Sequence, residues 1–306
     1  LPIDFTSSIQ SLPRLPIDPT NTSSTGLYYT YIANPTTQTY EILASSESKK
    51  YITVARQDGG FDPERIEKGS DRFLWQSIYG LVGYWAFNEG SGTQVLDLSG
   101  NNNMGTLING PTWQTASNCK METCLSFDGS NDYVNLGLWV SAISLKALRG
   151  DWSYGVWIKT STTNGYIVNC TDTGDYVTLS VSAGKAKFLI KDYSPAPEKI
   201  ASAVSTTSIN DNQWHYVTGV WSGDNIYIYV DGVREGSDSG LNGFGNLLMS
   251  SWSGSWIVGA QWDSCCSTSP PGNRISMQFI GFISDVRIYN RALPAAEVLA
   301  IYNSTR

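Results

Sequence analysis

The sequence is poor in charged side chains and contains a single histidine. Charged residues make up 15% of the 306 residues, against roughly a quarter in typical soluble domains. The net charge is −7 and no basic stripe is present, which argues against nucleic acid or an anionic membrane surface as a partner. No apolar run approaches the roughly 18 residues of a membrane-spanning helix, so we expect no membrane span in this chain.

Several catalytic patterns are also missing. The sequence has no Gly-x-Ser-x-Gly elbow, the turn that carries the nucleophile of many hydrolases. No strand presents the pair of carboxylates, about 5 Å apart, that a retaining glycosidase needs. There is no Cys-x-x-Cys pair or Cys/His cluster, so a zinc site is not expected. We therefore predict that the chain is not an enzyme, the alternative being a polysaccharide hydrolase or lyase whose site comes from distant segments.

The five cysteines indicate an oxidising compartment. Cys119 and Cys124 flank a four-residue loop just before an alternating segment, and we predict a disulfide between them. Cys170 is a candidate partner for Cys265 or Cys266, which leaves one thiol over. A bridge between the two adjacent cysteines, with Cys170 left over, is the alternative.

Residues 1–78 differ from the rest of the chain. The chain begins at Leu1 without an initiator Met or a signal peptide, so we expect a processed or truncated product. Prolines exclude a long helix at the start. Residues 26–33 and 38–45 are rich in strand-forming side chains and flank an Asn-Pro-Thr-Thr turn, which predicts a β-hairpin followed by a loop-rich segment.

This first segment resembles the C-terminal half of type IV pilins and pseudopilins. The resemblance depends on Leu15-Pro16-Ile17-Asp18-Pro19, on Leu27-Tyr28-Tyr29-Thr30-Tyr31 and on Tyr40-Glu41-Ile42. In that family the Leu-Pro-x-Asp-Pro turn leads into an antiparallel sheet that packs on a long N-terminal helix. The residues from Leu1 on do not include that helix or the prepilin cleavage site, as we expect of a processed or truncated product. The resemblance implies neighbouring pilin subunits in a filament as partners.

Residues 81–306 are predicted to form many short strands and one helix. Strands of a sandwich or barrel alternate apolar and polar residues between turn signals, as residues 152–158, 175–181 and 282–289 do. Asp231-Gly232 is expected to be a tight hairpin turn. A short helix is expected at Pro294–Tyr302, with Pro294 at its first position. Ala186, Phe188 and Ile190 should face one way, and Lys185, Lys187 and Lys191 the other.

The same region closely resembles the laminin-G-like (concanavalin A-like) sandwich domains of bacterial surface proteins. That family implies two curved antiparallel sheets, adjacent first and last strands, and binding or adhesion as the function. It also makes the position of His215 a structural one. The resemblance depends on five ordered blocks: Gly83–Gly92 with Asp97–Thr106, Leu125–Val134, Trp214–Trp221, Tyr229–Val233 and Phe279–Pro294.

The resemblance also implies a structural calcium ion where the first and last strands meet. Calcium is bound by carboxylate and carbonyl oxygens, and the residues that fit are Glu89 and Asp285. Asp285 stands alone in a strand otherwise free of acids. The alternative for Asp285 is an ion pair with Arg287 or Arg291, or simple exposure.

Two other aspartates, Asp97 and Asp128, belong to loops. We expect them to accept hydrogen bonds from their own turns rather than to bind metal. The Asp58–Asp62 loop is a second candidate for calcium.

Aromatic side chains in small-residue loops are the candidate ligand contacts. Trp252 and Trp262 flank loops, where their flat faces could stack on a sugar or a protein partner. Tyr193 is a weaker candidate. Trp256 should face the core. The alternative for the two loop tryptophans is packing under the 265–273 loop.

Together these features predict a mostly β protein: a pilin-like β-hairpin segment, residues 1–78, followed by a laminin-G-like β-sandwich, residues 81–306, with a short C-terminal helix. We expect an extracellular subunit of a bacterial pilus or an adhesin on the bacterial cell surface, which binds a glycan or another surface ligand. The alternatives are a free secreted lectin-like protein and a purely structural filament subunit.

Overall fold

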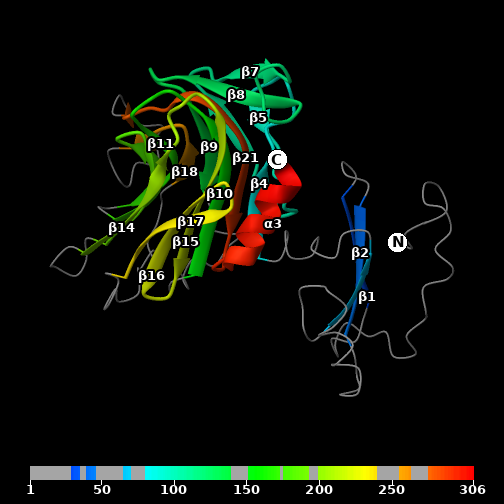
Figure 1. The fold of residues 1–306 in the computed structure, drawn as a ribbon. Coiled ribbons are helices and arrows are strands. Elements are labelled where there is room, and N and C mark those ends of the chain that lie inside the picture. The colour runs from blue at the N-terminus through cyan, green and yellow to red at the C-terminus, as the bar shows by residue number, and fades with distance from the viewer. Residues whose placement is uncertain are drawn as a thin grey trace. The chain divides into compact units, whose positions relative to one another are not determined.

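The chain divides into two compact units, Leu1–Ser77 and Ile78–Arg306, which are considered separately (Figure 1). The computed structural model describes residues 29–34, 39–45, 65–69, 80–138, 151–172, 175–192, 199–239, 255–262 and 275–306. Within that part of the chain, no helix is both long and apolar enough to cross a bilayer.

The first unit contains a three-stranded antiparallel sheet. Its strands are β1 (Tyr29–Asn34), β2 (Thr39–Ser45) and β3 (Arg65–Gly69), in that order. Tyr29 pairs with Ala44, which confirms the predicted hairpin. Strand β3 was not predicted, because its sequence Arg-Ile-Glu-Lys-Gly lacks the run of branched and aromatic residues that favours strands. The likeness of this unit to pilins stays a prediction.

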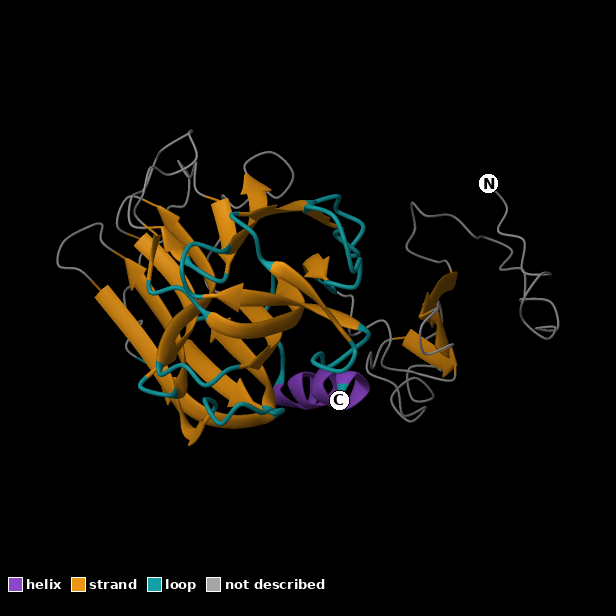
Figure 2. Ribbon diagram, turned by 90° about the horizontal axis from the view of Figure 1, so that it is seen from above, coloured by secondary structure: helices purple, strands orange, loops and turns teal. Residues whose placement is uncertain are grey.

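The second unit is a sandwich of two antiparallel sheets (Figures 1 and 2), as the sequence predicts. The first, here called the helix-side sheet, has the order β17-β16-β15-β10-β21-β8-β7, with β4 beside β21. Its strands are β4 (Leu81–Trp85), β7 (Thr112–Thr115), β8 (Thr123–Asp128), β10 (Asp151–Lys159), β15 (Trp214–Ser222), β16 (Asn225–Val230), β17 (Val233–Asp238) and β21 (Ile280–Tyr289).

The second, here called the opposite sheet, has the order β14-β13-β12-β11-β18-β9-β6-β5. Its strands are β5 (Gln94–Val95), β6 (Gly105–Ile108), β9 (Tyr133–Leu138), β11 (Asn164–Asp172), β12 (Asp175–Ser182), β13 (Lys185–Asp192), β14 (Lys199–Ser208) and β18 (Ser255–Val258). A separate two-stranded ribbon joins β19 (Gln261–Trp262) to β20 (Ile275–Ser276).

The core lies between the two sheets and follows from the alternation of the strands. In β13, Ala186, Phe188 and Ile190 are fully buried while the residues between them are partly exposed, as predicted. Trp256 of β18 is 1% exposed and stacks on Trp152 of β10, with ring centroids 6.4 Å apart. The prediction that Trp256 faces the core is therefore confirmed. Each large side chain buried in this way contributes about 1.5–3 kcal/mol.

The first and last strands of the sandwich are adjacent, as the family resemblance implies. Trp85 of β4 pairs with Val286 of β21. The pairing of β10 with β21 is shifted by a bulge between Gly155 and Trp157 of β10. Asp285 lies at the corresponding point of β21 and has φ +52°. A bulge re-aims side chains, and its effect on Asp285 is described below.

Two local predictions at turns and ends are confirmed. Asp231 and Gly232 take φ +50° and +80° between β16 and β17, the conformation of a two-residue hairpin turn. The predicted helix is present as α3 (Ala295–Thr305), but Pro294 is its N-cap with an extended backbone and not its first residue, and the helix runs three residues beyond the predicted end. Val298 and Ile301 are buried with Trp157 and Tyr216 on the outer face of the helix-side sheet.

The predicted disulfide between Cys119 and Cys124 is present. Cys170 is buried in β11. Its proposed partners, Cys265 and Cys266, lie outside the described residues, so their pairing stays a prediction.

Candidate functional site

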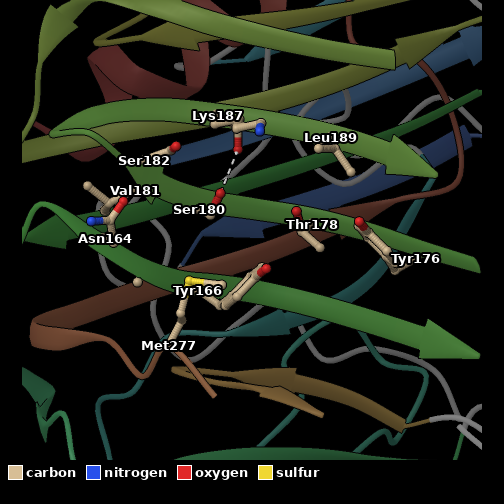
Figure 3. A pocket seen from close by; sticks show the side chains of 11 residues that line it. Asn164, Tyr166, Tyr176, Thr178, Ser180, Val181, Ser182, Lys187, Leu189 and Met277 are labelled. Carbon is tan, nitrogen blue, oxygen red and sulfur yellow. Dashed lines mark hydrogen bonds between the residues drawn. The ribbon is translucent and has the colours of Figure 1, made fainter. Parts of the chain in front are cut away.

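A pocket of about 190 Å³ lies on the outer face of the opposite sheet, over β11, β12 and β13 (Figure 3). Met277, just after β20, forms part of its wall. The peptide N–H of Tyr166 donates to the Met277 carbonyl at 3.0 Å, which holds that segment against β11. The lining residues are Asn164, Gly165, Tyr166, Tyr176, Thr178, Ser180, Val181, Ser182, Lys187, Leu189 and Met277.

The pocket is assembled by strand alternation. Because successive side chains of a strand point to opposite faces, Val177, Leu179 and Val181 of β12 face the core and the residues between them face outward. Val181 also lines the pocket, although it belongs to the core. The outward set on β12 is Tyr176, Thr178, Ser180 and Ser182.

Register places unlike side chains next to one another across the strands. Tyr166 of β11 is opposite Ser180 of β12, and Ser180 is opposite Lys187 of β13. A tyrosine, a serine and a lysine therefore follow one another along one row across the sheet. The first and last strands of the row, β11 and β13, are about 10 Å apart. We call this the Tyr166–Lys187 row.

The polar groups of the pocket are partly engaged by the protein. The Ser180 hydroxyl donates to the Lys187 carbonyl at 3.4 Å. The Lys191 ammonium lies 5.5 Å from the ring centroid of Tyr176, within the range of a cation–π contact. The pocket thus offers aromatic faces, hydroxyls and a cation on a fixed β-sheet surface.

The ligand residues predicted from the sequence do not line this pocket. Trp252 and Tyr193 lie outside the described residues. Trp262 belongs to β19, where its backbone pairs with Ile275, and its side chain is not described. Their roles stay predictions. Sequence reasoning missed Tyr166 and Tyr176, although their outward positions in strands of buried aliphatic residues were a signal.

Asp285 forms a buried ion pair, one of the two alternatives to metal binding. It is 0% exposed, and its two carboxylate oxygens accept hydrogen bonds from Arg287 Nε at 2.6 Å and Nη2 at 3.0 Å. The Tyr84 hydroxyl donates to Oδ2 at 3.2 Å. Burial, followed by the charge of Asp285, raises the pKa of Tyr84 to about 12, so the phenol stays protonated as a donor.

Asp285 in this arrangement does not fit a calcium site, because a guanidinium already occupies both of its oxygens. Glu89 accepts a hydrogen bond from the Leu96 N–H at 2.7 Å through Oε1, while Oε2 is buried with no hydrogen-bond partner among the described residues. The described part of the chain contains no group of three or more His, Cys, Asp or Glu that could hold a metal ion. Calcium at Glu89 stays a prediction, tested by melting with and without a chelator.

The loop aspartates behave as expected. Asp97 accepts from the N–H of Ser99 at 2.9 Å, and Asp128 from the N–H of Ser130 at 2.7 Å. Both are bonds to the residue two positions on, the Asx turn. Asp97 also accepts from the Tyr84 N–H at 3.0 Å and so ties the loop to β4. The Asp58–Asp62 loop lies outside the described residues.

His215 lies between two aspartates. Its Nδ1 is 2.8 Å from Asp231 Oδ2 and its Nε2 is 3.2 Å from Asp211 Oδ1. The hydrogen bond to Asp231 is the largest cause of a raised His215 pKa. Because Asp231 also accepts the Tyr216 N–H at 2.9 Å, the group fixes the hairpin turn to β15. This geometry agrees with a structural histidine.

A laminin-G-type family model, described as the concanavalin A-like lectin/glucanases superfamily, matches residues 128–299. The matched range contains all of β11, β12 and β13, and therefore the pocket. It lies within the region 81–306 that the sequence motifs assigned to this fold.

Solved structures of similar fold include carbohydrate- and receptor-binding domains. Domain 4 of AbnA, an extracellular arabinanase from Geobacillus stearothermophilus, solved in complex with arabinotriose, is 17% identical, with a TM-score of 0.52 over 72% of this chain and 98% of that one. The receptor-binding domain of botulinum neurotoxin mosaic serotype C/D is 16% identical, with a TM-score of 0.54 over 74% and 51%.

The binding domain of Paraclostridial Mosquitocidal Protein 1 is 19% identical, with a TM-score of 0.53 over 74% of this chain and 52% of that one. The chain thus spans about half the length of this domain and of the botulinum neurotoxin domain. At these identities the likeness shows a shared fold.

Proposed function

Because the chain belongs to the concanavalin A-like lectin/glucanases superfamily, through its laminin-G-type domain, we propose that the sandwich is a glycan-binding module. Its ligand lies in the pocket over β11–β13. The observation that carries the proposal is the lining itself, where Tyr166 and Tyr176 stand among the hydroxyls of Thr178, Ser180 and Ser182. This is the side-chain chemistry that sugars require.

Sugar rings have an apolar face and a polar edge. A tyrosine ring packs against the apolar face and keeps its own hydroxyl in water. Hydroxyl side chains donate and accept at the edge, and a few polar groups placed in this way fix the orientation of a ligand. Because the side chains stand on hydrogen-bonded strands, little is spent on ordering the site when a ligand binds.

The lining supports binding rather than hydrolysis. Among the described residues that surround the pocket there is no carboxylate and no histidine. Glycoside hydrolysis generally needs two carboxyl groups that flank the scissile bond. We therefore infer a recognition domain that leaves its ligand intact. Release of reducing ends from a polysaccharide by the purified chain would contradict this inference.

Two of the similar structures support the proposal by what they bind. Domain 4 of AbnA is in complex with arabinotriose, and the botulinum neurotoxin domain is a receptor-binding domain. The neurotoxin likeness covers 51% of that domain. The support is for the class of function and not for a particular sugar.

Titration of the full chain with a broad panel of soluble glycans tests the proposal. Tyr166→Ala and Tyr176→Ala should each weaken the tightest interaction by about fivefold, since stacking on an aromatic ring contributes about 1 kcal/mol. Tyr227→Ala is the matched control, because Tyr227 is a partly exposed tyrosine on β16 of the other sheet. Equal losses in all three variants, or no binding to any glycan, would overturn the proposal.

We further propose that the first unit attaches this module to an extracellular filament of the pilin type. The support is the Leu15–Pro19 motif followed by an antiparallel β1-β2-β3 sheet. The Cys119–Cys124 disulfide supports an oxidising, extracellular location. Intact mass of the native protein and the coding sequence upstream of Leu1 test the proposal. A prepilin cleavage site before a hydrophobic helix is expected, and an ordinary secretory signal would contradict it.

A further inference from the structure

The outer face of β12, β13 and β14 is cationic in an acidic protein. The chain has a net charge of −7, yet no carboxylate occurs among the described outward side chains of these three strands. Three of the outward residues are lysines. The outward set includes Tyr176, Thr178, Ser180, Ser182, Lys185, Lys187, Leu189, Lys191, Ile200, Ser202, Val204, Thr206 and Ser208.

The ammonium groups of the three lysines differ in their contacts with the protein. The Lys185 ammonium donates to the Thr206 carbonyl, and the Lys191 ammonium lies over the Tyr176 ring. Lys187 lines the pocket, and no hydrogen bond, ion pair or ring contact of its ammonium is formed with the protein among the described residues. Among the described lysines of this face, Lys187 is thus the one that lines the pocket and whose ammonium is not engaged by another group of the protein.

The two carboxylates of β17, on the neighbouring edge of the sandwich, are already engaged. Glu235 of β17 accepts hydrogen bonds from the N–H and hydroxyl groups of Thr206 and Thr207, at 2.6–3.1 Å. Asp238 accepts from the N–H of Ser202 at 2.9 Å. Both carboxylates therefore join β17 to β14 and do not neutralise Lys187.

From this arrangement we infer that the pocket selects acidic glycans, whose carboxylate or sulfate group is bound by Lys187 while a sugar ring packs on Tyr166 or Tyr176. The inference rests on the proposed function and adds the class of ligand to it. The Tyr166–Lys187 row supplies the spacing: the stacked ring and the anionic group lie about two strand spacings apart, or about 10 Å.

The preference for an acid follows from desolvation. A glycan that covers Lys187 removes water from its ammonium, and a buried charge without a partner is costly. An anionic substituent replaces that water with a charge-assisted hydrogen bond. A neutral glycan of the same shape offers no such replacement, and it should bind less well even though its stacking is identical.

The test uses pairs of glycans in which one member has lost its acidic groups: polygalacturonate and its methyl ester, hyaluronan and its carboxyl-reduced form, and heparan sulfate and its desulfated, N-acetylated and carboxyl-reduced form. For the full chain, the acidic member of at least one pair should bind about tenfold tighter, the size of one charge-assisted contact. This difference should shrink as salt is added.

Lys187→Gln should abolish the difference within the pair, because the variant has no cation to bind the acidic group. Lys159→Gln is the matched control, because it removes the same charge from β10 of the helix-side sheet and should leave the difference intact. A tenfold preference that survives Lys187→Gln overturns the inference, as does single-stranded DNA that binds as tightly as the acidic glycan.

The outcomes also separate the inference from the proposal beneath it. If neutral forms bind as well as acidic ones and Tyr166→Ala weakens both, the glycan-binding function holds and the acidic preference is wrong. If no member of any pair binds, both are wrong.

Discussion

The buried pair of Asp285 and Arg287 shows how one residue can decide the stability of the sandwich. Asp285 is fully buried and Arg287 supplies two of its three hydrogen-bond donors. The guanidinium also lies 4.4 Å from the ring centroid of Tyr84. A buried charge that loses its partner is far more destabilising than the loss of the whole pair.

Arg287→Met should therefore lower the free energy of unfolding by about 3–5 kcal/mol, because the Asp285 carboxylate stays buried without its partner. The double variant Asp285→Asn/Arg287→Met should recover part of that loss. Denaturant unfolding of the three proteins measures both effects. A loss below about 1 kcal/mol in Arg287→Met would contradict the importance of this pair.

His215 should make the stability depend on pH. Its raised pKa in the folded state means that the protonated form is bound more favourably by Asp231 and Asp211 in the fold than in the unfolded chain. The stabilisation is fully present below the unfolded pKa, about 6.5. It is lost as the pH rises through the folded pKa.

The variant His215→Gln isolates this contribution. The difference in unfolding free energy between the natural chain and His215→Gln should be largest near about pH 5.5 and should fall by about pH 8.5. Unfolding curves at both values give that difference. A difference that stays constant, or that grows as the pH rises, would show that the protonated histidine does not stabilise the fold.

Residues whose partners are local in sequence were predictable, and residues with distant partners were not. Asp97 and Asp128 follow the Asx-turn rule because their partners lie two positions away. For Asp285 the sequence left calcium and an ion pair open. The choice depends on a bulge in β21 and on Tyr84, about 200 residues earlier, which no local pattern encodes.

At the scale of elements, the sandwich is closed on one side by a few hydrogen bonds between edge strands. Glu235 of β17 accepts four hydrogen bonds from Thr206 and Thr207 of β14. Edge strands with unpaired backbone groups are prone to pair with other chains, and these bonds occupy part of that edge.

Glu235→Ala should destabilise the chain by about 1–2 kcal/mol, the typical net value of such a contact. Amide exchange should quicken at Thr206 and Thr207, whose N–H groups lose their acceptor. Val233→Ala is a control on the same strand, because Val233 is 59% exposed. Unchanged exchange at these two amides in Glu235→Ala would show that the contact does not hold the edge.

Elements with strong patterns were predicted well. The hairpin of β1 and β2, the strands β10, β12 and β13, and helix α3 all carry a clear period of apolar residues. Strand β3 was missed because pairing with β2, rather than the propensity of its charged sequence, creates it. Tertiary context overrides weak strand propensity in this way.

At the scale of the whole molecule, the fold was readable from the sequence and the pocket was not. The order of motif blocks indicated a sandwich with adjacent first and last strands, which the pairing of β4 with β21 confirms. The pocket combines outward residues of three strands with Met277, about a hundred residues later. The sequence analysis instead predicted ligand contacts at Trp252 and Trp262, because these residues flank loops and loops often carry binding residues.

The proposed function depends on where a glycan binds, and hydrogen–deuterium exchange of the full chain with and without its tightest glycan measures this directly. We predict that protection on binding is concentrated in peptides that cover β11, β12 and β13 (residues 164–192), with weaker protection around Met277. Protection confined to the helix-side sheet or to α3, with none in residues 164–192, would contradict the proposed site.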